Sequence, residues 1–191
     1  MSNRANAARG RSPVPQSKSW MWLTKSDERK ALTMVKDNDH APEFDLPSDG
    51  GGRLRLKDFR GRFVVLYFYP RDDTEGCTLE AREFSTLAGA FERAGAVVIG
   101  ISPDSPKSHD KFKCKYELDL RLASDEEKST AEAYGVWVEK KMYGRTFMGV
   151  ERATFLISPK GKIARIWRKV SPKGHAEAVL AELNNQDKSA K

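Results

Sequence analysis

A continuous apolar and aromatic run does most to limit the folds open to this chain. Residues 62–69 read RFVVLYFY and lie between Gly61 and Pro70. A strand with one buried face alternates apolar and polar residues, so an unbroken run indicates a central strand covered on both faces. Residues 96–101 form a second run of the same kind. The chain is therefore expected to fold around a sheet with other elements packed on each side.

Segments with helical spacing alternate with these strands. Residues 77–94 end at Gly95, and Pro106 suits the first turn of a second helix that runs to about Glu117. Further expected elements are extended segments near 44–46, 54–56 and 120–122, helices near 126–134 and 174–184, and a hairpin of residues 153–158 and 163–168. This order predicts an α/β fold with a central mixed sheet flanked by helices.

Basic charge is concentrated at the start of the chain. The formal net charge of the 191 residues is +7, and residues 1–25 supply +5 of it, because they contain five basic residues and no acidic one. This start also lacks apolar periodicity and should be disordered. We expect a basic extension over residues 1–39, a folded domain over residues 40–185 and a flexible C-terminus over residues 186–191. The extension could be a solvated tail, an organelle transit peptide or a nucleic-acid-binding arm.

The composition argues against several classes of protein. No apolar run approaches the roughly 20 residues that span a bilayer, and the start lacks the apolar core of a signal peptide. A cytoplasmic location is expected, with organelle targeting by the extension left open. Two cysteines do not form a disulfide scaffold. Neither a metal nor another cofactor is expected, because no glycine-rich phosphate loop is present and the histidines lack metal-ligand spacing; these are His40, His109 and His175.

One stretch between a buried strand and a helix carries candidate chemistry. It reads PRDDTEGC, from Pro70 to Cys77, at the carboxyl end of the strand, where open α/β sheets place ligands. Cys77 falls in the first helical turn, where free N–H groups and the helix dipole stabilise a thiolate, the nucleophile of sulfur chemistry. Thr74 can cap the helix and offer a hydroxyl beside the sulfur. A free cysteine can also be a small buried hydrophobic residue, so position alone leaves both interpretations open.

The spacing Pro70-x-x-x-Thr74-x-x-Cys77 resembles the active-site pattern of peroxiredoxins. The string VVLYFYPRDDTEGCTLEAREF is similar to the group called bacterioferritin comigratory protein, or peroxiredoxin Q. The likeness continues through APEFDLP, ISPDSPKSHDKF and MYGRTFMGVERATFLI, and covers about residues 40–183. The resemblance implies a thioredoxin-like fold and a thiol-dependent peroxidase that reduces hydrogen peroxide and organic hydroperoxides.

The resemblance also implies a role for each site residue. Cys77 would be the peroxidatic cysteine, which attacks the peroxide and becomes a sulfenic acid. Thr74 would hydrogen-bond the peroxide, and Pro70 would limit the access of water. Arg152, in VERATFLI, would stabilise the thiolate and the transition state through its guanidinium. Glu80 matches a frequent family residue, but we interpret it as a carboxylate on the helix surface and leave it out of the site.

A second cysteine bears on how the sulfenic acid is resolved before it is over-oxidised. Many members of the group carry the resolving cysteine five residues after the peroxidatic one, where this chain has Arg82. Others carry it on the next helix, where Cys114 lies one residue beyond the matching position, on the polar side away from Phe112. We expect an intramolecular Cys77–Cys114 disulfide that thioredoxin or a similar dithiol protein recycles. A one-cysteine mechanism with an external thiol is the alternative.

Three other functions fit parts of the sequence. A thiol-disulfide oxidoreductase on the same fold would need a C-x-x-C pair, but position 80 is Glu. A binding protein could use the basic tail, although only +2 of the net charge of +7 remains after residue 25, so the domain is not expected to bind nucleic acid. A peroxide sensor would use the same chemistry at Cys77. The resemblance favours a monomer.

Overall fold

The computed structural model describes residues 34–142 and 144–189, so most of the predicted extension over residues 1–39 lies outside the described residues. The strands are β1 (Asp45–Pro47), β2 (Arg53–Arg55), β3 (Phe63–Phe68), β4 (Ala96–Ser102), β5 (Arg121–Ser124), β6 (Trp137–Met142), β7 (Arg145–Val150), β8 (Ala153–Ile157) and β9 (Ile163–Arg168). The α-helices are α2 (Glu75–Thr86), α3 (Ala88–Arg93), α4 (Pro106–Tyr116), α5 (Ser129–Ala133) and α6 (His175–Ser189).

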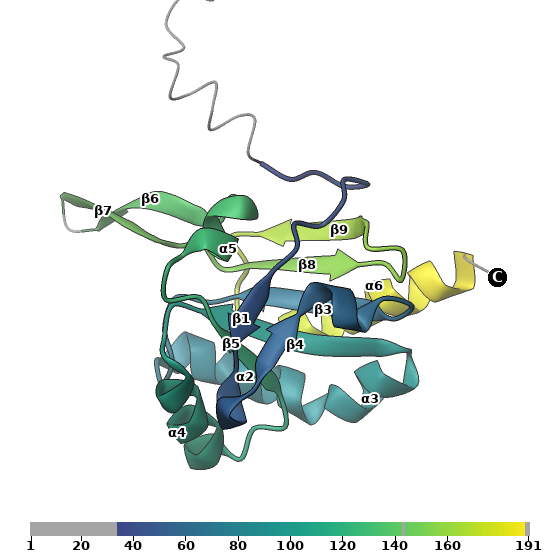
Figure 1. Cartoon of the computed structure of the whole chain (residues 1–191), viewed down its shortest axis with the longest axis horizontal. Helices are drawn as coiled ribbons and strands as arrows, with labels where there is room; N and C mark the ends of the chain where they lie inside the picture. The colour runs from purple at the N-terminus through teal and green to yellow at the C-terminus, as the bar shows by residue number, and fades with distance from the viewer. Residues whose placement is uncertain (1–33, 143, 190–191) are drawn as a thin grey trace, which may run out of the picture. The chain divides into compact units, whose positions relative to one another are not determined.

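Five of these strands form the central sheet, in the order β5-β4-β3-β8-β9 (Figure 1). The pairs β3–β4 and β4–β5 are parallel, whereas β3–β8 and β8–β9 are antiparallel. Strand β3 is central, with Leu66 opposite Ile99 on one side and Phe155 on the other. The predicted α/β fold with a mixed sheet, the central strand and the C-terminal hairpin are confirmed.

The two faces of the sheet bury separate apolar clusters. Alternate residues of β3 supply both, since Val64, Leu66 and Phe68 join one cluster while Val65 and Tyr67 join the other. The second cluster also takes in side chains from four helices, namely α2, α3, α4 and α6, whereas the first is closed by α5 and the β1–β2 hairpin (Figure 1). This burial on both faces explains the unbroken apolar run of the sequence.

Two features depart from the predicted elements. The helix expected over residues 77–94 is interrupted at Leu87, whose ψ of 2° ends α2 and starts α3. Phe84, before the break, and Phe91, after it, are both fully buried, with ring centroids 5.8 Å apart. The β6–β7 hairpin had no counterpart among the predictions, because its exposed residues carry no apolar alternation that signals a buried face.

Hydrogen bonds and helical residues also lie just outside the bounds of 40 and 185 proposed for the domain. Asn38 and Asp39 form backbone hydrogen bonds with Ile163 at the start of β9, at 2.7 and 2.9 Å. The closing helix α6 continues to Ser189. In the part of the chain that the structure describes, no helix is long and apolar enough to cross a membrane.

Candidate active site

The loop that follows β3 leads directly into the first turn of α2, where Cys77 lies. Thr74 is the N-cap, with an extended backbone, and its carbonyl oxygen accepts a hydrogen bond from the N–H of Thr78 at 2.8 Å. Cys77 is buried, with 2% of its surface exposed. The free N–H groups of a helix's first turn favour an anion, so this position suits a thiolate.

Arg152, the residue that precedes β8, contacts the sulfur of Cys77. Because β8 runs antiparallel to β3 and Phe68 is opposite Ala153, the residue before β8 lies at the end of β3 where the loop begins. The Nη2 of Arg152 donates to the Sγ of Cys77 at 3.2 Å. The pairing of two strands thus joins residues that are 75 positions apart, and it places a guanidinium beside the candidate nucleophile.

Glu80 is the third member of this cluster, and its interpretation as a surface carboxylate is wrong. It is fully buried and forms an ion pair with the Nη1 of Arg152. It lies three positions after Cys77, so both side chains are on the buried face of α2. The sequence did offer a signal for the burial of Glu80, because it lies one helical turn after the candidate nucleophile.

Burial and the neighbouring guanidinium act in opposite directions on the pKa of Glu80. Burial raises the pKa of its carboxyl to about 7, although the nearby Arg152 opposes this effect. Within the described residues, its Oε1 has no hydrogen-bond partner. For Arg152, burial lowers the pKa, but Glu80 and Cys77 more than offset this, so that the pKa is raised. The guanidinium therefore stays charged and is shared between a carboxyl group and a sulfur.

The other two predicted site residues flank the loop. Pro70 is half-buried at the end of the central strand. Thr74 is exposed, and its hydroxyl donates to the carbonyl oxygen of Arg71 at 3.2 Å. We had expected this hydroxyl to cap α2, but the Thr74 side chain forms no capping hydrogen bond, although the residue occupies the N-cap position. The loop's own turn thus satisfies that hydroxyl. At Gly76 a Cβ atom would meet the Nη2 of Arg152 and the Cγ of Pro172, both at 3.4 Å, so the site is closely packed.

Two further titratable groups surround Arg152 and had not been singled out. Lys140, on β6, donates to the carbonyl oxygen of Val150 at 2.6 Å, and its pKa is lowered by burial and by Arg152. His175 lies 2.8 Å from the Oγ1 of Thr154, and burial together with Arg152 lowers its pKa to about 4. At both groups the positive charge of Arg152 thus adds to the effect of burial in disfavouring a second positive charge.

Cys114 lies apart from this cluster. It is exposed near the end of α4, whereas His109 and Phe112 on the same helix are buried, as the helical wheel predicts. Both cysteines are free thiols. Any bond between them requires part of α4 or of the loop to move, since one sulfur is buried and the other faces solvent.

In residues 34–142 and 144–189, no group of three or more His, Cys, Asp or Glu side chains could hold a metal ion. The candidate site therefore consists of a buried thiol at a helix N-terminus, a guanidinium and a buried carboxyl group. Such an arrangement can stabilise a thiolate and the charge that develops when it attacks a polar bond.

Comparison with known proteins agrees with this chemistry. The family model of the AhpC/TSA family matches residues 38–166. A putative peroxiredoxin Bcp of Coxiella burnetii is 48% identical over 143 residues, which cover 75% of this chain and 95% of that protein. The peroxiredoxin Bcp of Bacillus subtilis is 45% identical over 145 residues, or 76% of this chain and 92% of that one.

Solved structures give the same picture. The bacterioferritin comigratory protein of Xanthomonas campestris, from work on alkyl peroxide reduction, has a TM-score of 0.72 at 43% identity and covers 75% of this chain and 91% of that chain. BcpB of Mycobacterium tuberculosis has a TM-score of 0.70 at 34% identity, over 79% and 97%. Other structures of the X. campestris protein carry serine in place of one or the other of two cysteines 36 positions apart. In this chain 37 positions separate Cys77 from Cys114.

Proposed function

Since the chain belongs to the AhpC/TSA family, as a thiol peroxidase of the bacterioferritin comigratory protein group, we propose that Cys77 is the sulfur that attacks the peroxide. The observation that carries this proposal is the 3.2 Å contact between the Nη2 of Arg152 and the Sγ of Cys77 at the N-terminus of α2. The substrates would be hydrogen peroxide and organic hydroperoxides.

In the first step the Cys77 thiolate attacks the terminal oxygen of the peroxide. A sulfur–oxygen bond forms, the oxygen–oxygen bond breaks, and the other oxygen leaves as an alkoxide or hydroxide that takes up a proton. Negative charge moves from sulfur to oxygen during this step, and the guanidinium of Arg152 can stabilise it because Nη2 lies at the sulfur while Nη1 is held by Glu80. The product on the enzyme is a sulfenic acid at Cys77.

Thr74 and Pro70 would shape the approach of the peroxide. We assign to Thr74 a hydrogen bond with the peroxide, for which its hydroxyl must leave the carbonyl oxygen of Arg71. An exposed hydroxyl in a 3.2 Å bond can turn at little cost. Pro70, half-buried at the end of β3, would keep water from the sulfur.

The sulfenic acid would then be resolved by Cys114. Its thiol attacks the Sγ of Cys77, a disulfide forms, and water leaves. The exposure of Cys114 supports this role, because free cysteines are usually among the most buried residues. The two cysteines that were replaced in the X. campestris protein, at nearly the same separation, support it further. A dithiol protein such as thioredoxin would reduce the disulfide by exchange.

Turnover measurements on two variants test the assignment of the cysteines. With thioredoxin and its reductase in a coupled assay, Cys77→Ser should lose all peroxidase activity. Cys114→Ser should consume one equivalent of peroxide and then stop. Full turnover by Cys114→Ser with thioredoxin would instead establish a one-cysteine mechanism, and residual turnover by Cys77→Ser would contradict the proposal.

A further inference from the structure

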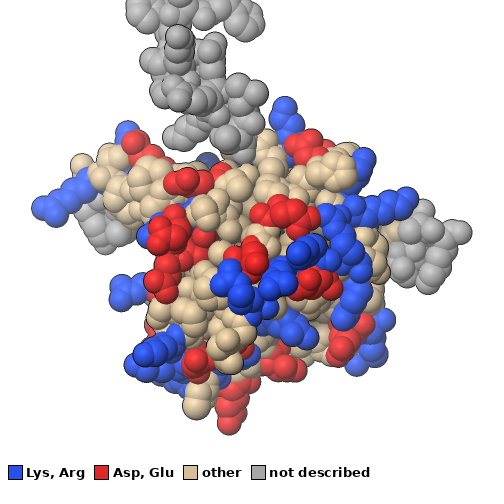
Figure 2. All heavy atoms as spheres, viewed as in Figure 1, with Lys and Arg blue, Asp and Glu red and all other residues tan. Residues whose placement is uncertain are grey.

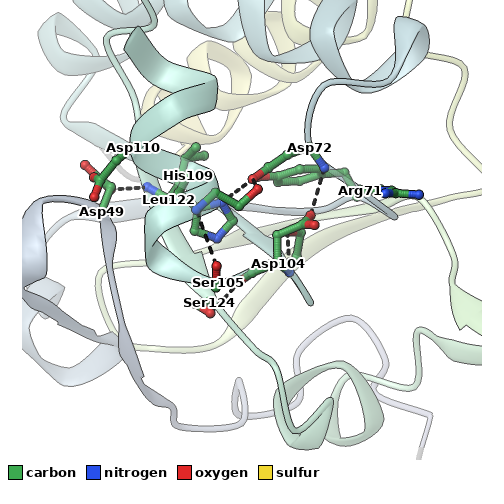
Figure 3. A network of polar contacts seen from close by, with 12 residues as sticks. Asp49, Arg71, Asp72, Asp104, Ser105, His109, Asp110, Leu122 and Ser124 are labelled. Carbon is green, nitrogen blue, oxygen red and sulfur yellow. Dashed lines mark hydrogen bonds and ion pairs between the residues drawn. The ribbon is translucent and has the colours of Figure 1, made fainter. Parts of the chain in front are cut away.

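Two consecutive aspartates tie the active-site loop to α4, the helix that carries Cys114. The first of them, Asp72, is buried and accepts hydrogen bonds from the hydroxyls of Tyr69 and Ser108, both at 2.7 Å. Its Oδ2 also lies 2.9 Å from the Nδ1 of His109 (Figure 3). Ser108 and His109 belong to the first half of α4. Asp72 is thus a buried anchor for that half of the helix.

The anchor extends into the sheet. The backbone N–H of Asp72 donates to Asp104 at 2.8 Å, and the hydroxyl of Ser102, at the end of β4, donates to the same carboxylate at 2.7 Å (Figure 3). The hydroxyl of Ser124, on β5, reaches the carbonyl oxygen of Asp104 at 2.5 Å. Polar groups that are buried and mutually hydrogen-bonded are costly to separate, so this half of α4 is held firmly.

The second aspartate, Asp73, makes a different connection. It is exposed, and its carboxylate accepts two hydrogen bonds from the Nζ of Lys115, both at 2.8 Å, and one from the hydroxyl of Tyr116 at 2.6 Å. These two residues lie beside Cys114 in the last turn of α4. We call the group Asp73, Lys115 and Tyr116 the clasp. An ion pair in water contributes little, so the clasp is weak where the anchor is strong.

The end of α4 is also easily unwound. Its C-cap, Glu117, has a left-handed backbone with a φ of 53°, a conformation that few residues other than glycine favour. The turn is also held by the ion pair of Lys113 with Asp49, at 2.5 Å and partly exposed, and by the packing of the Tyr116 ring on Phe112. Helix ends open more readily than helix centres, and here the opening turn is the one that carries Cys114.

From these contacts we infer that Asp73, through Lys115 and Tyr116, is a positioning residue that sets how fast the last turn of α4 opens to deliver Cys114 to the oxidised Cys77. The buried anchor at Asp72 confines the opening to that turn. This inference rests on the proposed resolving role of Cys114. The clasp holds the last turn of α4 closed, and the preceding part of the helix, with the buried His109 and Phe112, stays wound.

The clasp would therefore decide between two fates of the sulfenic acid. Attack by Cys114 gives the disulfide and water. Attack by the sulfenate on a second peroxide forms another sulfur–oxygen bond, breaks the oxygen–oxygen bond and gives a sulfinic acid and an alcohol or water. A faster opening of the last turn favours the first outcome. Chains with a weakened clasp should accordingly withstand more peroxide.

Two conservative substitutions release the clasp without touching the reacting groups. Tyr116→Phe removes one hydroxyl and keeps the ring that packs on Phe112, with centroids 5.5 Å apart. Asp73→Asn removes the charge and tolerates the positive φ of this position, 56°, since asparagine readily adopts that conformation. Asp45→Asn is the matched control, because Asp45 is an exposed carboxylate paired with Arg53 and Arg55 away from the loop.

Stopped-flow tryptophan fluorescence and quenched peptide mapping separate the steps. Both clasp variants should form the Cys77–Cys114 disulfide roughly three- to fivefold faster than wild type and need correspondingly more peroxide for half-maximal sulfinic acid. Their first oxidation should proceed at the wild-type rate. The Asp73→Asn/Tyr116→Phe double variant should form the disulfide little faster than either single variant does. Asp73→Glu, which keeps the charge, should form it at a rate between those of Asp73→Asn and wild type. Unchanged disulfide formation, or equal slowing of both steps, overturns the inference.

Amide hydrogen exchange distinguishes this inference from the resolving role itself. In a Cys114→Ser background, residues 113–117 should exchange faster than residues 108–112, and Tyr116→Phe should accelerate only the former. If wild type forms no Cys77–Cys114 disulfide, the resolving role fails; if exchange is uniform along α4 or changes throughout it, the clasp fails whatever the disulfide result.

Discussion

At the scale of single residues, one guanidinium serves two partners. Arg152 contacts both the sulfur of Cys77 and the buried carboxyl of Glu80, so a substitution at Arg152 should change reactivity and stability together. The two effects can be separated, because the stability loss comes from leaving a buried carboxyl unpaired, whereas the loss of rate comes from an uncompensated transition state.

Arg152→Met should lower the second-order rate constant of Cys77 with hydrogen peroxide by about 10²–10³-fold. It should also destabilise the fold, because Glu80 loses its partner. In Arg152→Met/Glu80→Gln the free energy of unfolding should recover while the rate constant stays low. Competition kinetics at pH 7 and urea denaturation measure the two quantities. A rate constant within tenfold of wild type in either variant would contradict the role of Arg152.

Glu80 predicts a pH dependence of stability. Its pKa of about 7 in the folded chain exceeds its ordinary value of 4.5, so the folded state binds this proton more tightly than the unfolded state does. Glu80 therefore favours folding below pH 4.5, and that contribution is lost as the pH rises to 7. Relative to Glu80→Gln, wild type should lose on the order of 3 kcal/mol of unfolding free energy over this interval. A difference that does not change with pH would show that Glu80 titrates normally.

Residue types and spacing alone could not have assembled this site. Cys77 was found from its place after a buried strand, but Arg152 entered only through the family resemblance, since nothing local distinguishes it from a surface arginine. The register of β3 against β8 brings Arg152 to Cys77, and that register could not be predicted from the sequence. Glu80 was misjudged because burial, which decides its role, depends on the partner that Arg152 supplies.

At the scale of the elements, the packing of β4 depends on a glycine, Gly100, which leaves room for side chains of the neighbouring strands. A Cβ atom at Gly100 would lie 2.6 Å from the hydroxyl of Tyr67 and 2.9 Å from Leu122. Gly100→Ala should therefore cost about 1–3 kcal/mol through overpacking. Gly89→Ala is the control: its Cβ atom would contact only Arg93, at 3.5 Å, and a helical alanine should stabilise by about 0.5–1 kcal/mol. Urea denaturation of both variants checks the opposite signs.

The elements were predictable where burial leaves a strong pattern. The runs over 62–69 and 96–101 became β3 and β4, and the C-terminal hairpin became β8 and β9. The break at Leu87 escaped prediction because neither glycine nor proline occupies that position, and Gly89, two residues later, lies within α3. The β6–β7 hairpin escaped because a two-stranded ribbon with exposed residues has no buried face to impose alternation.

At the scale of the whole molecule, we propose that the folded part acts as a cytoplasmic monomer and leaves any binding of nucleic acid to the basic start of the chain. Figure 2 shows Lys and Arg interspersed with Asp and Glu over the viewed face of the domain. Opposite charges mixed in this way give nucleic acid no extended positive surface on that face.

Truncation tests this division. Removal of residues 1–33 should leave the peroxidase rate within about twofold of wild type, and any salt-sensitive binding to nucleic acid should disappear. Removal of residues 1–41 should lower stability, because Asn38, Asp39 and Ala41 form backbone hydrogen bonds with residues 161–163. Gel filtration, the coupled assay and thermal melts check the oligomeric state, the rate and the stability. Loss of activity on removing residues 1–33 would assign a catalytic part to the extension.

The most direct test of the central claim treats fully reduced protein with one equivalent of hydrogen peroxide and follows the intact mass and a non-reducing peptide map. We predict the loss of two hydrogens and a linked pair of peptides that contain Cys77 and Cys114. Gain of one oxygen on Cys77, with Cys114 still free, would keep the peroxidase and reject the resolving role. Oxidation of Cys77 no faster than that of a small free thiol would contradict the account at its centre.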